Sequence, residues 1–265
     1  MKSHHTGPSG TPAGRLSRRH VLQVTAATTV LVAALGRSGA WAGGTPAVLD
    51  GWARDLVDLN QALTRREITV LDWQARVAQL NQSVSVPELV SYLDIDRLTR
   101  HFSYPSRLAE FADPLLPPHL MGQGRRTWFV RVFGLRRGGA IIPHVHNHMV
   151  SAHLVVSGSF HVRTHDRLQD LADAVVLRPS QDRITAMGDV ITMSDQKDNQ
   201  HWMVAEQDRS MTFDVGVVDL PASYRYAMTA EAYNMIYVDA DRRPEQDGLV
   251  IAPRLTFEQC AKKYA

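Results

Sequence analysis

The chain has 265 residues, and its 29 Lys and Arg residues stand against 27 Asp and Glu residues, which gives a formal net charge of +2. A balance this close to neutral provides no basic surface of the kind that binds nucleic acid, so no nucleic-acid partner is expected. Cys260 is the one cysteine, which excludes an intrachain disulfide and a cysteine-based zinc site.

The first 42 residues have the order of a signal peptide. Arg18 and Arg19 precede an apolar run over residues 24–35, and Ala40-Trp41-Ala42 provides a small-residue cleavage site. The paired arginines resemble the twin-arginine export signal. The run of 12 residues is shorter than the roughly 20 that a membrane-spanning helix needs. We therefore expect export of the folded protein to the periplasm or beyond, and no stable membrane insertion after cleavage.

Removal of residues 1–42 changes the charge balance, because that segment holds five basic residues and no acidic one. The mature chain then carries 24 basic residues against 27 acidic ones, a formal charge of −3. Its 223 residues suit one large domain, or one domain with a helical extension.

Residues 43–127 are predicted to form a helical extension followed by a connector. Apolar residues recur at spacings of three and four from Leu49 to Leu63, and again over residues 70–84, which predicts two amphipathic helices. A third, short helix is expected after Ser85, with Pro87 in its first turn. Four prolines and two glycines between residues 103 and 127 predict the connector.

From Trp128 onward the hydrophobic period changes to two. Turn signals separate seven predicted strands, which cover residues 128–135, 140–148, 151–163, 173–177, 189–193, 201–205 and 211–220. Short strands at close spacing are typical of an antiparallel β-barrel or jelly roll. We therefore predict a mainly β chain with a barrel over residues 128–220 and a mixed C-terminal segment over residues 221–265. The helical extension is expected to cover one mouth of this barrel.

Four of the chain's 12 histidines fall within one eleven-residue stretch that begins with Pro-His-Val-His. Because residues two apart on a strand point to the same side, His144, His146 and His148 are expected to share a face. Two imidazoles in a His-x-His pair can bind one metal ion with little rearrangement. A third ligand must come from another strand, and His153 and His201 are the candidates.

This pattern resembles the first signature of the cupins, in which a Gly precedes a His-x-His pair by five intervening residues and a second Gly follows. Gly138, His144, His146 and Gly158 take those places. His201 takes the place of the histidine in the second signature. The resemblance covers residues 128–220 and implies a small β-barrel that holds one divalent metal ion on His144, His146 and His201.

The chain departs from that pattern at Ser151, which stands where the cupin signature has a glutamate. His153 is in phase with Ser151, so both side chains are expected to point into the barrel. His153 is therefore a candidate fourth ligand or a catalytic acid/base. Asp214 lies between apolar neighbours and is expected to point inward, as a base or as a group that orients a ligand histidine. Arg131 interrupts an apolar strand and is a candidate for binding a substrate anion, with an exposed edge position as the alternative.

Three neutral imidazoles leave two or three coordination positions open on a metal ion. The set also resembles the thiol dioxygenase branch of the cupins, but the Ser-x-His-x-Tyr run of that branch is missing here, so thiol oxidation is not assigned. We expect an Fe(II)-dependent, dioxygenase-like oxidoreductase that acts on a small anionic molecule, with Zn, Ni, Cu or Mn as other metals. The alternatives are a non-catalytic metal- or ligand-binding cupin and a metal-assisted lyase or isomerase. The resemblance also implies a homodimer.

Overall fold

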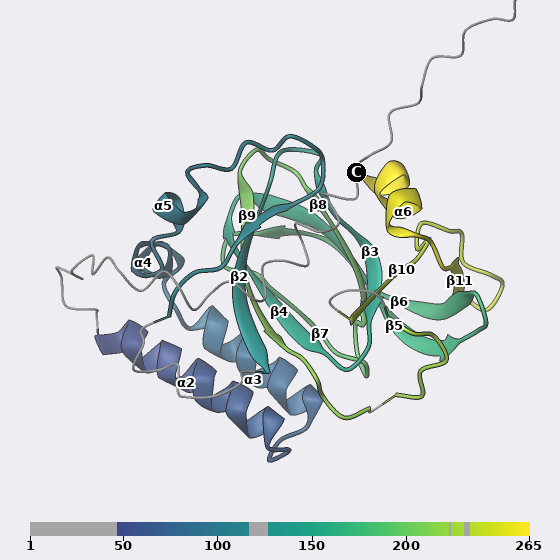
Figure 1. Cartoon of the computed structure of the whole chain (residues 1–265), viewed down its shortest axis with the longest axis horizontal. Helices are drawn as coiled ribbons and strands as arrows, with labels where there is room; N and C mark the ends of the chain where they lie inside the picture. The colour runs from purple at the N-terminus through teal and green to yellow at the C-terminus, as the bar shows by residue number, and fades with distance from the viewer. Residues whose placement is uncertain (1–46, 117–126, 223, 231–233) are drawn as a thin grey trace, which may run out of the picture. The chain divides into compact units, whose positions relative to one another are not determined.

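Two antiparallel β-sheets and a layer of helices make up the protein in the computed structural model (Figure 1). The structure describes residues 47–116, 127–222, 224–230 and 234–265, so the predicted signal peptide lies outside the described residues. The helices are α2 (Ala47–Thr64), α3 (Val70–Gln82), α4 (Val86–Tyr92), α5 (Ile95–Thr99) and α6 (Phe257–Tyr264). The strands are β1 (Glu110–Ala112), β2 (Trp128–Leu135), β3 (Ala140–His146), β4 (Val150–Ser157), β5 (Ser159–Asp170), β6 (Ala174–Ala186), β7 (Val190–Met193), β8 (Gln200–Ala205), β9 (Ser210–Val217), β10 (Met235–Tyr237) and β11 (Val250–Pro253).

The helices begin where local polar groups satisfy the first backbone N–H groups. Thr69 caps α3 in a reciprocal capping box with Asp72. α4 starts after Ser85 and has Pro87 in its first turn, as predicted, although the Ser85 side chain makes no capping hydrogen bond. Asp94 adopts a left-handed φ of 51° between α4 and α5. Among the described residues, no helix is long and apolar enough to cross a lipid bilayer.

The predicted fold class is confirmed: the chain is mainly β, with a cupin-like antiparallel barrel that follows a helical extension. One sheet has the order β1-β2-β9-β4-β7, and the other has the order β10-β3-β8-β5-β6-β11. Two short strands at sheet edges, β1 and β11, were not predicted. The β5–β6 hairpin is also longer than expected, because β5 continues to Asp170 and β6 to Ala186.

The two faces of the five-stranded sheet lie in different environments, one inside the barrel and one against the helices. Residues directly opposite in an antiparallel pair point to the same face. Arg131 lies opposite Asp214, and Asp214 lies opposite His153, so these three polar residues share the inner face. Their neighbours Phe213 and Leu154 point outward into an apolar cluster that includes residues of α2, α3 and α4. Inside the barrel, a second apolar cluster fills the space beside the polar residues: Leu135, Val155, Phe160, Val162, Ile191, Met193, Met203 and Ala205.

The helical extension packs on the outer face of this sheet, so the expectation that it covers a barrel mouth is wrong (Figure 1). The rings of Trp52 on α2 and Phe213 on β9 lie 5.7 Å apart. Buried Gln74 on α3 accepts a hydrogen bond from the Ser194 hydroxyl at 2.7 Å, just after β7. The apolar face of the sheet buries the apolar stripes of the helices, which removes both surfaces from water.

We expect Phe213→Ala to lower the free energy of unfolding by about 3–5 kcal/mol, because the side chain is fully buried between sheet and helices. Urea unfolding followed by circular dichroism measures the loss. The matched control is Leu71→Ala on α3, where the side chain is 43% exposed and the expected change is within about 0.5 kcal/mol. Equal losses for the two variants would contradict the packing of the helices on this sheet.

Candidate metal centre

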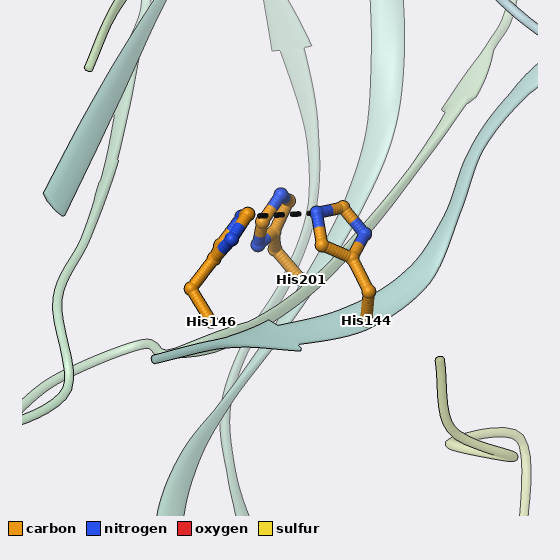
Figure 2. A group of neighbouring side chains, drawn as sticks. All are labelled: His144, His146 and His201. Atoms are coloured by element: carbon orange, nitrogen blue, oxygen red, sulfur yellow. Dashed lines mark hydrogen bonds between the residues drawn. The ribbon is translucent and has the colours of Figure 1, made fainter. Parts of the chain in front are cut away.

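Three buried histidines meet at the inner face of the six-stranded sheet. His144 and His146 belong to β3, and His201 lies directly opposite His144 on the neighbouring strand β8. Figure 2 shows the three rings turned toward one another. Their candidate ligand nitrogens all lie within 4.8 Å of one another, and Nε2 of His144 is 3.1 Å from Nε2 of His146. The structure therefore brings together the three residues that the sequence predicted as metal ligands.

An irregularity in β3 turns the His-x-His pair inward. The register between β3 and β8 shifts between Ile141 and His144, so an extra residue enters β3 there. Ile142 consequently packs outward in a cluster with Cys260 of α6, although it precedes His144 by two residues. After the shift, strand alternation holds as predicted: His144 and His146 point inward, and Val145 points outward into another apolar cluster.

Burial keeps the imidazoles of His144 and His201 neutral. Loss of hydration lowers the pKa of His144 to about 4, against the opposing effect of its hydrogen bond to the Ile142 carbonyl. Burial also lowers the pKa of His201 well below its ordinary value, and the neighbouring histidines add to the effect. A neutral imidazole is the form that binds a metal ion.

The hydrogen bonds of the His144 and His201 rings determine which nitrogen of each ring can bind a metal ion. Nδ1 of His144 lies 2.7 Å from the Ile142 carbonyl oxygen, and Nδ1 of His201 lies 3.5 Å from that of Asn199. A carbonyl oxygen can only accept, so Nδ1 of each ring carries the proton and the lone pair is on Nε2. Metal-ligating histidines make this kind of hydrogen bond almost without exception.

The spacing of the nitrogens also fits one ion. Two nitrogens bound at about 2.0–2.1 Å lie about 2.9–3.4 Å apart for bond angles between 90° and 109°. The distance of 3.1 Å between the Nε2 atoms of His144 and His146 falls in this range. The residues present therefore suit a divalent metal ion, and softness alone does not choose among Fe, Zn, Ni and Cu.

His153 and Asp214 form a pair beside the three histidines. Nδ1 of His153 lies against a carboxylate oxygen of Asp214 across the β4–β9 ladder, and both side chains are almost fully buried. The His153 ring is centred 5.4 Å from the His201 ring, but His153 is not part of the ligand group found among the described residues. Ser151 points inward as predicted, with its hydroxyl 3.5 Å from Nε2 of His153. The site thus has a histidine held by a carboxylate next to its three ligands.

Two further candidates lie apart from the cluster. Arg131 is on the inner face, but its guanidinium pairs with Asp113 and lies 4.2 Å from the centre of the Phe111 ring. A carboxylate within the chain thus supplies an anion for Arg131, and its role toward a substrate stays a prediction. His148 follows the end of β3 with a left-handed φ of 57°, and its Nδ1 contacts the Leu220 carbonyl. It therefore does not share the face of His144.

The sequence analysis missed two residues that contact the ligand strand. Arg167 donates a hydrogen bond to the backbone carbonyl of His146. Asn199 donates to the same carbonyl and accepts from the backbone N–H of His146. Asn199 stands two residues before His201, a position that marks it as a neighbour of the site. Arg167 gave no signal, because its strand was predicted to end at residue 163.

No family model and no curated protein matches the sequence. Solved structures that resemble the chain include KdgF from a Halomonas species, with 17% identity over 42% of this chain and 78% of that one, and a TM-score of 0.30. A cupin superfamily protein from Desulfitobacterium hafniense has 12% identity over 42% of this chain and 78% of its own, with a TM-score of 0.29. YcfD, a ribosomal oxygenase from Escherichia coli, has 18% identity over 36% of this chain and 24% of its own, with a TM-score of 0.28. Likenesses this weak do not indicate a ligand or a reaction.

We expect the metal-free protein to lose stability as the pH falls from about 6.5 toward 4. In that range the unfolded chain takes up a proton at His144 that the folded chain excludes, because burial lowers the pKa to about 4. The full loss for one such histidine is about 3 kcal/mol. Urea unfolding in EDTA at a series of pH values measures it.

His144→Asn cannot take up this proton, so its stability should depend less on pH than that of the parent. His101→Asn, at an exposed histidine, is the control and should follow the parent. The same slope for the parent and His144→Asn would show that His144 is not buried in its neutral form.

Proposed function

We propose that this chain is an enzyme that binds one divalent metal ion through His144, His146 and His201 and uses His153 with Asp214 to move a proton on a bound small molecule. The observation on which the proposal rests is the buried His153–Asp214 pair next to a group that has three ligands among the described residues. It supports proton transfer, as in a metal-assisted lyase or isomerase, more directly than the oxygen chemistry expected from the sequence.

The same observation argues against a non-catalytic carrier. A protein that only stores a metal is best served by a closed set of four ligands, as structural sites show. Here the group among the described residues has three ligands, and the nearby polar side chains of Ser151, His153 and Asp214 are not among them. An incomplete ligand set next to a buried histidine–carboxylate pair is the arrangement of catalytic sites.

The roles of the residues follow from their contacts. Asp214 contacts Nδ1 of His153 and orients the ring. Nε2 of His153 is then the atom that takes and returns a proton, with the Ser151 hydroxyl 3.5 Å away as a neighbour that can accept or donate a hydrogen bond. When bound, a divalent ion supplies a positive charge that polarises a carbonyl or carboxylate oxygen.

The chemistry of the ligands favours an anionic substrate. Three neutral imidazoles cancel none of the charge of a divalent ion, and Ser151 replaces the carboxylate that would cancel part of it. The Asp214 carboxylate pairs with His153, so it does not offset the charge of the ion either. A small carboxylate-containing molecule with a second oxygen, such as a 2-hydroxy or 2-keto acid, supplies both the charge and the two donor atoms.

We expect purified protein, expressed with its own residues 1–42, to contain close to one divalent metal ion per chain by plasma mass spectrometry. His144→Ala/His146→Ala should lose it, because one ligand alone does not hold the ion. His161→Ala, at a histidine paired with Asp182 on the outside of β5, is the matched control and should keep it. Absence of metal from the parent would refute the proposal.

The metal-loaded protein is expected to exchange carbon-bound hydrogens of small 2-keto and 2-hydroxy acids with D2O, followed by NMR. His153→Gln should slow this exchange by about 10²–10⁴-fold with its metal content unchanged. Asp214→Asn should also slow it, since the ring loses its orienting carboxylate. Oxygen uptake is measured in parallel with an oxygen electrode. Uptake of oxygen without hydrogen exchange would favour the dioxygenase-like oxidoreductase expected from the sequence.

Export to the periplasm and assembly into a homodimer belong to the same proposal. Their support is the sequence pattern of residues 1–42 and the resemblance to cupins, respectively. Signal cleavage can be checked by N-terminal sequencing of protein from a periplasmic extract.

A further inference from the structure

A fully buried arginine touches the strand that carries two of the candidate ligands. The side chain of Arg167 on β5 is 0% exposed. Its guanidinium forms a two-pronged ion pair with Asp170, with both N···O distances 2.7 Å. The remaining nitrogen, Nη1, donates to the backbone carbonyl of His146 at 3.1 Å and to the side-chain oxygen of Asn147 at 2.8 Å. Every group of this guanidinium is therefore committed to the end of β3 or to Asp170.

Asn199, in the connection between β7 and β8, binds both backbone groups of His146. Its Oδ1 accepts from the backbone N–H of His146 at 3.2 Å, and its Nδ2 donates to the His146 carbonyl at 3.1 Å. Its own carbonyl oxygen lies 3.5 Å from Nδ1 of His201. One residue thus contacts two candidate ligands that come from different strands.

These contacts lie at the end of the ligand strand, on the edge where its ladder has stopped. The last pair between β3 and β8 joins His144 to His201, so His146 is paired with β10 alone, and the chain turns away with a left-handed φ at His148. Two donors on one carbonyl fix the plane of the peptide that follows His146. A fixed peptide plane restricts the direction in which the His146 ring can point.

The energetics of a buried ion pair support a role beyond stability. Removing a guanidinium and a carboxylate from water is costly, and apolar replacements are often equally stable. An ion pair that only anchored the fold could therefore be replaced by apolar residues. Arg167 instead aims its third nitrogen at a ligand residue, while Asp170 accepts the backbone N–H groups of Ala227 and Met228.

We propose that Arg167 and Asn199 are positioning residues that set the geometry of the metal centre by clamping the backbone of His146. The inference rests on the proposed function, since it needs the three histidines to bind a metal ion. It adds two residues that touch neither the ion nor a substrate and act through His146 and, for Asn199, through His201.

The test is a Co²⁺ titration of the metal-free full-length protein, with affinity measured by competition with a chelating dye and coordination followed by the visible absorption of Co²⁺. Arg167→Met and Asn199→Ala should weaken Co²⁺ binding by about 10–100-fold and change the absorption spectrum. Arg167→Lys keeps the positive charge and one donor nitrogen. It should therefore bind Co²⁺ more tightly than Arg167→Met, though less tightly than the parent.

Two controls separate positioning from stability. Arg163→Met removes an arginine from the same strand whose side chain is one-third exposed and lies over Trp202, and it should leave the affinity unchanged. Leu154→Ala destabilises the apolar cluster on the outer face of the five-stranded sheet, which holds none of the three candidate ligands. It should lower the melting temperature of the metal-free protein without a matching loss of Co²⁺ affinity.

Each outcome decides the inference. Folded Arg167→Met and Asn199→Ala that bind Co²⁺ within twofold of the parent overturn it and leave the proposed function standing. If Leu154→Ala loses as much Co²⁺ affinity as Arg167→Met and Asn199→Ala at an equal drop in melting temperature, the losses reflect stability alone, and this result also overturns the inference. A parent that binds no metal overturns both. If Arg167→Met does not fold, Asn199→Ala and Arg167→Lys decide by the same criteria.

Discussion

Three imidazole rings that must stay neutral inside the protein are the constraint on which the site depends. Burial disfavours the charged forms of His144 and His201, so both rings stay available as ligands at a pH where an exposed histidine takes up a proton. Neutral rings still need acceptors for their N–H groups, and the backbone carbonyls of Ile142 and Asn199 face His144 and His201. The local course of the chain around the two strands thus determines which nitrogen of each ring faces the others.

The interior of the barrel has an apolar part and a polar part, and the histidines lie in the polar part. One part is filled by apolar side chains such as Phe160 and Met193, and the polar groups gather in the remaining part. The helices bury the other side of the five-stranded sheet, so that sheet is enclosed on both faces, which accounts for the nearly continuous burial of β4 and β9. Gln74 extends this support to Ser194, close to the turn that leads into β8.

The two sheets supply different chemistry to one centre. The candidate ligands come from β3 and β8 of the six-stranded sheet, and the His153–Asp214 pair comes from β4 and β9 of the facing sheet. A change in the separation of the sheets would alter the distance between the three histidines and His153 without disturbing either group internally. Arg167 and Asn199 act within the ligand sheet, because both contact His146.

The sequence by itself determined the features that depend on local periodicity. The bounds of β2, the opposite faces of His144 and Val145, and the inward direction of Ser151, His153 and Asp214 follow from alternation along single strands. The tertiary structure alone decided what depends on partners distant in sequence. The register shift before His144, the pairing of Arg131 with Asp113 and the helices on a sheet face arise from contacts between elements. Arg167 is the clearest case, because nothing near it in the sequence indicates that its guanidinium reaches a carbonyl 21 residues away. Periodicity specifies the face on which a side chain lies, whereas the group it meets there is set by the packing of the whole barrel.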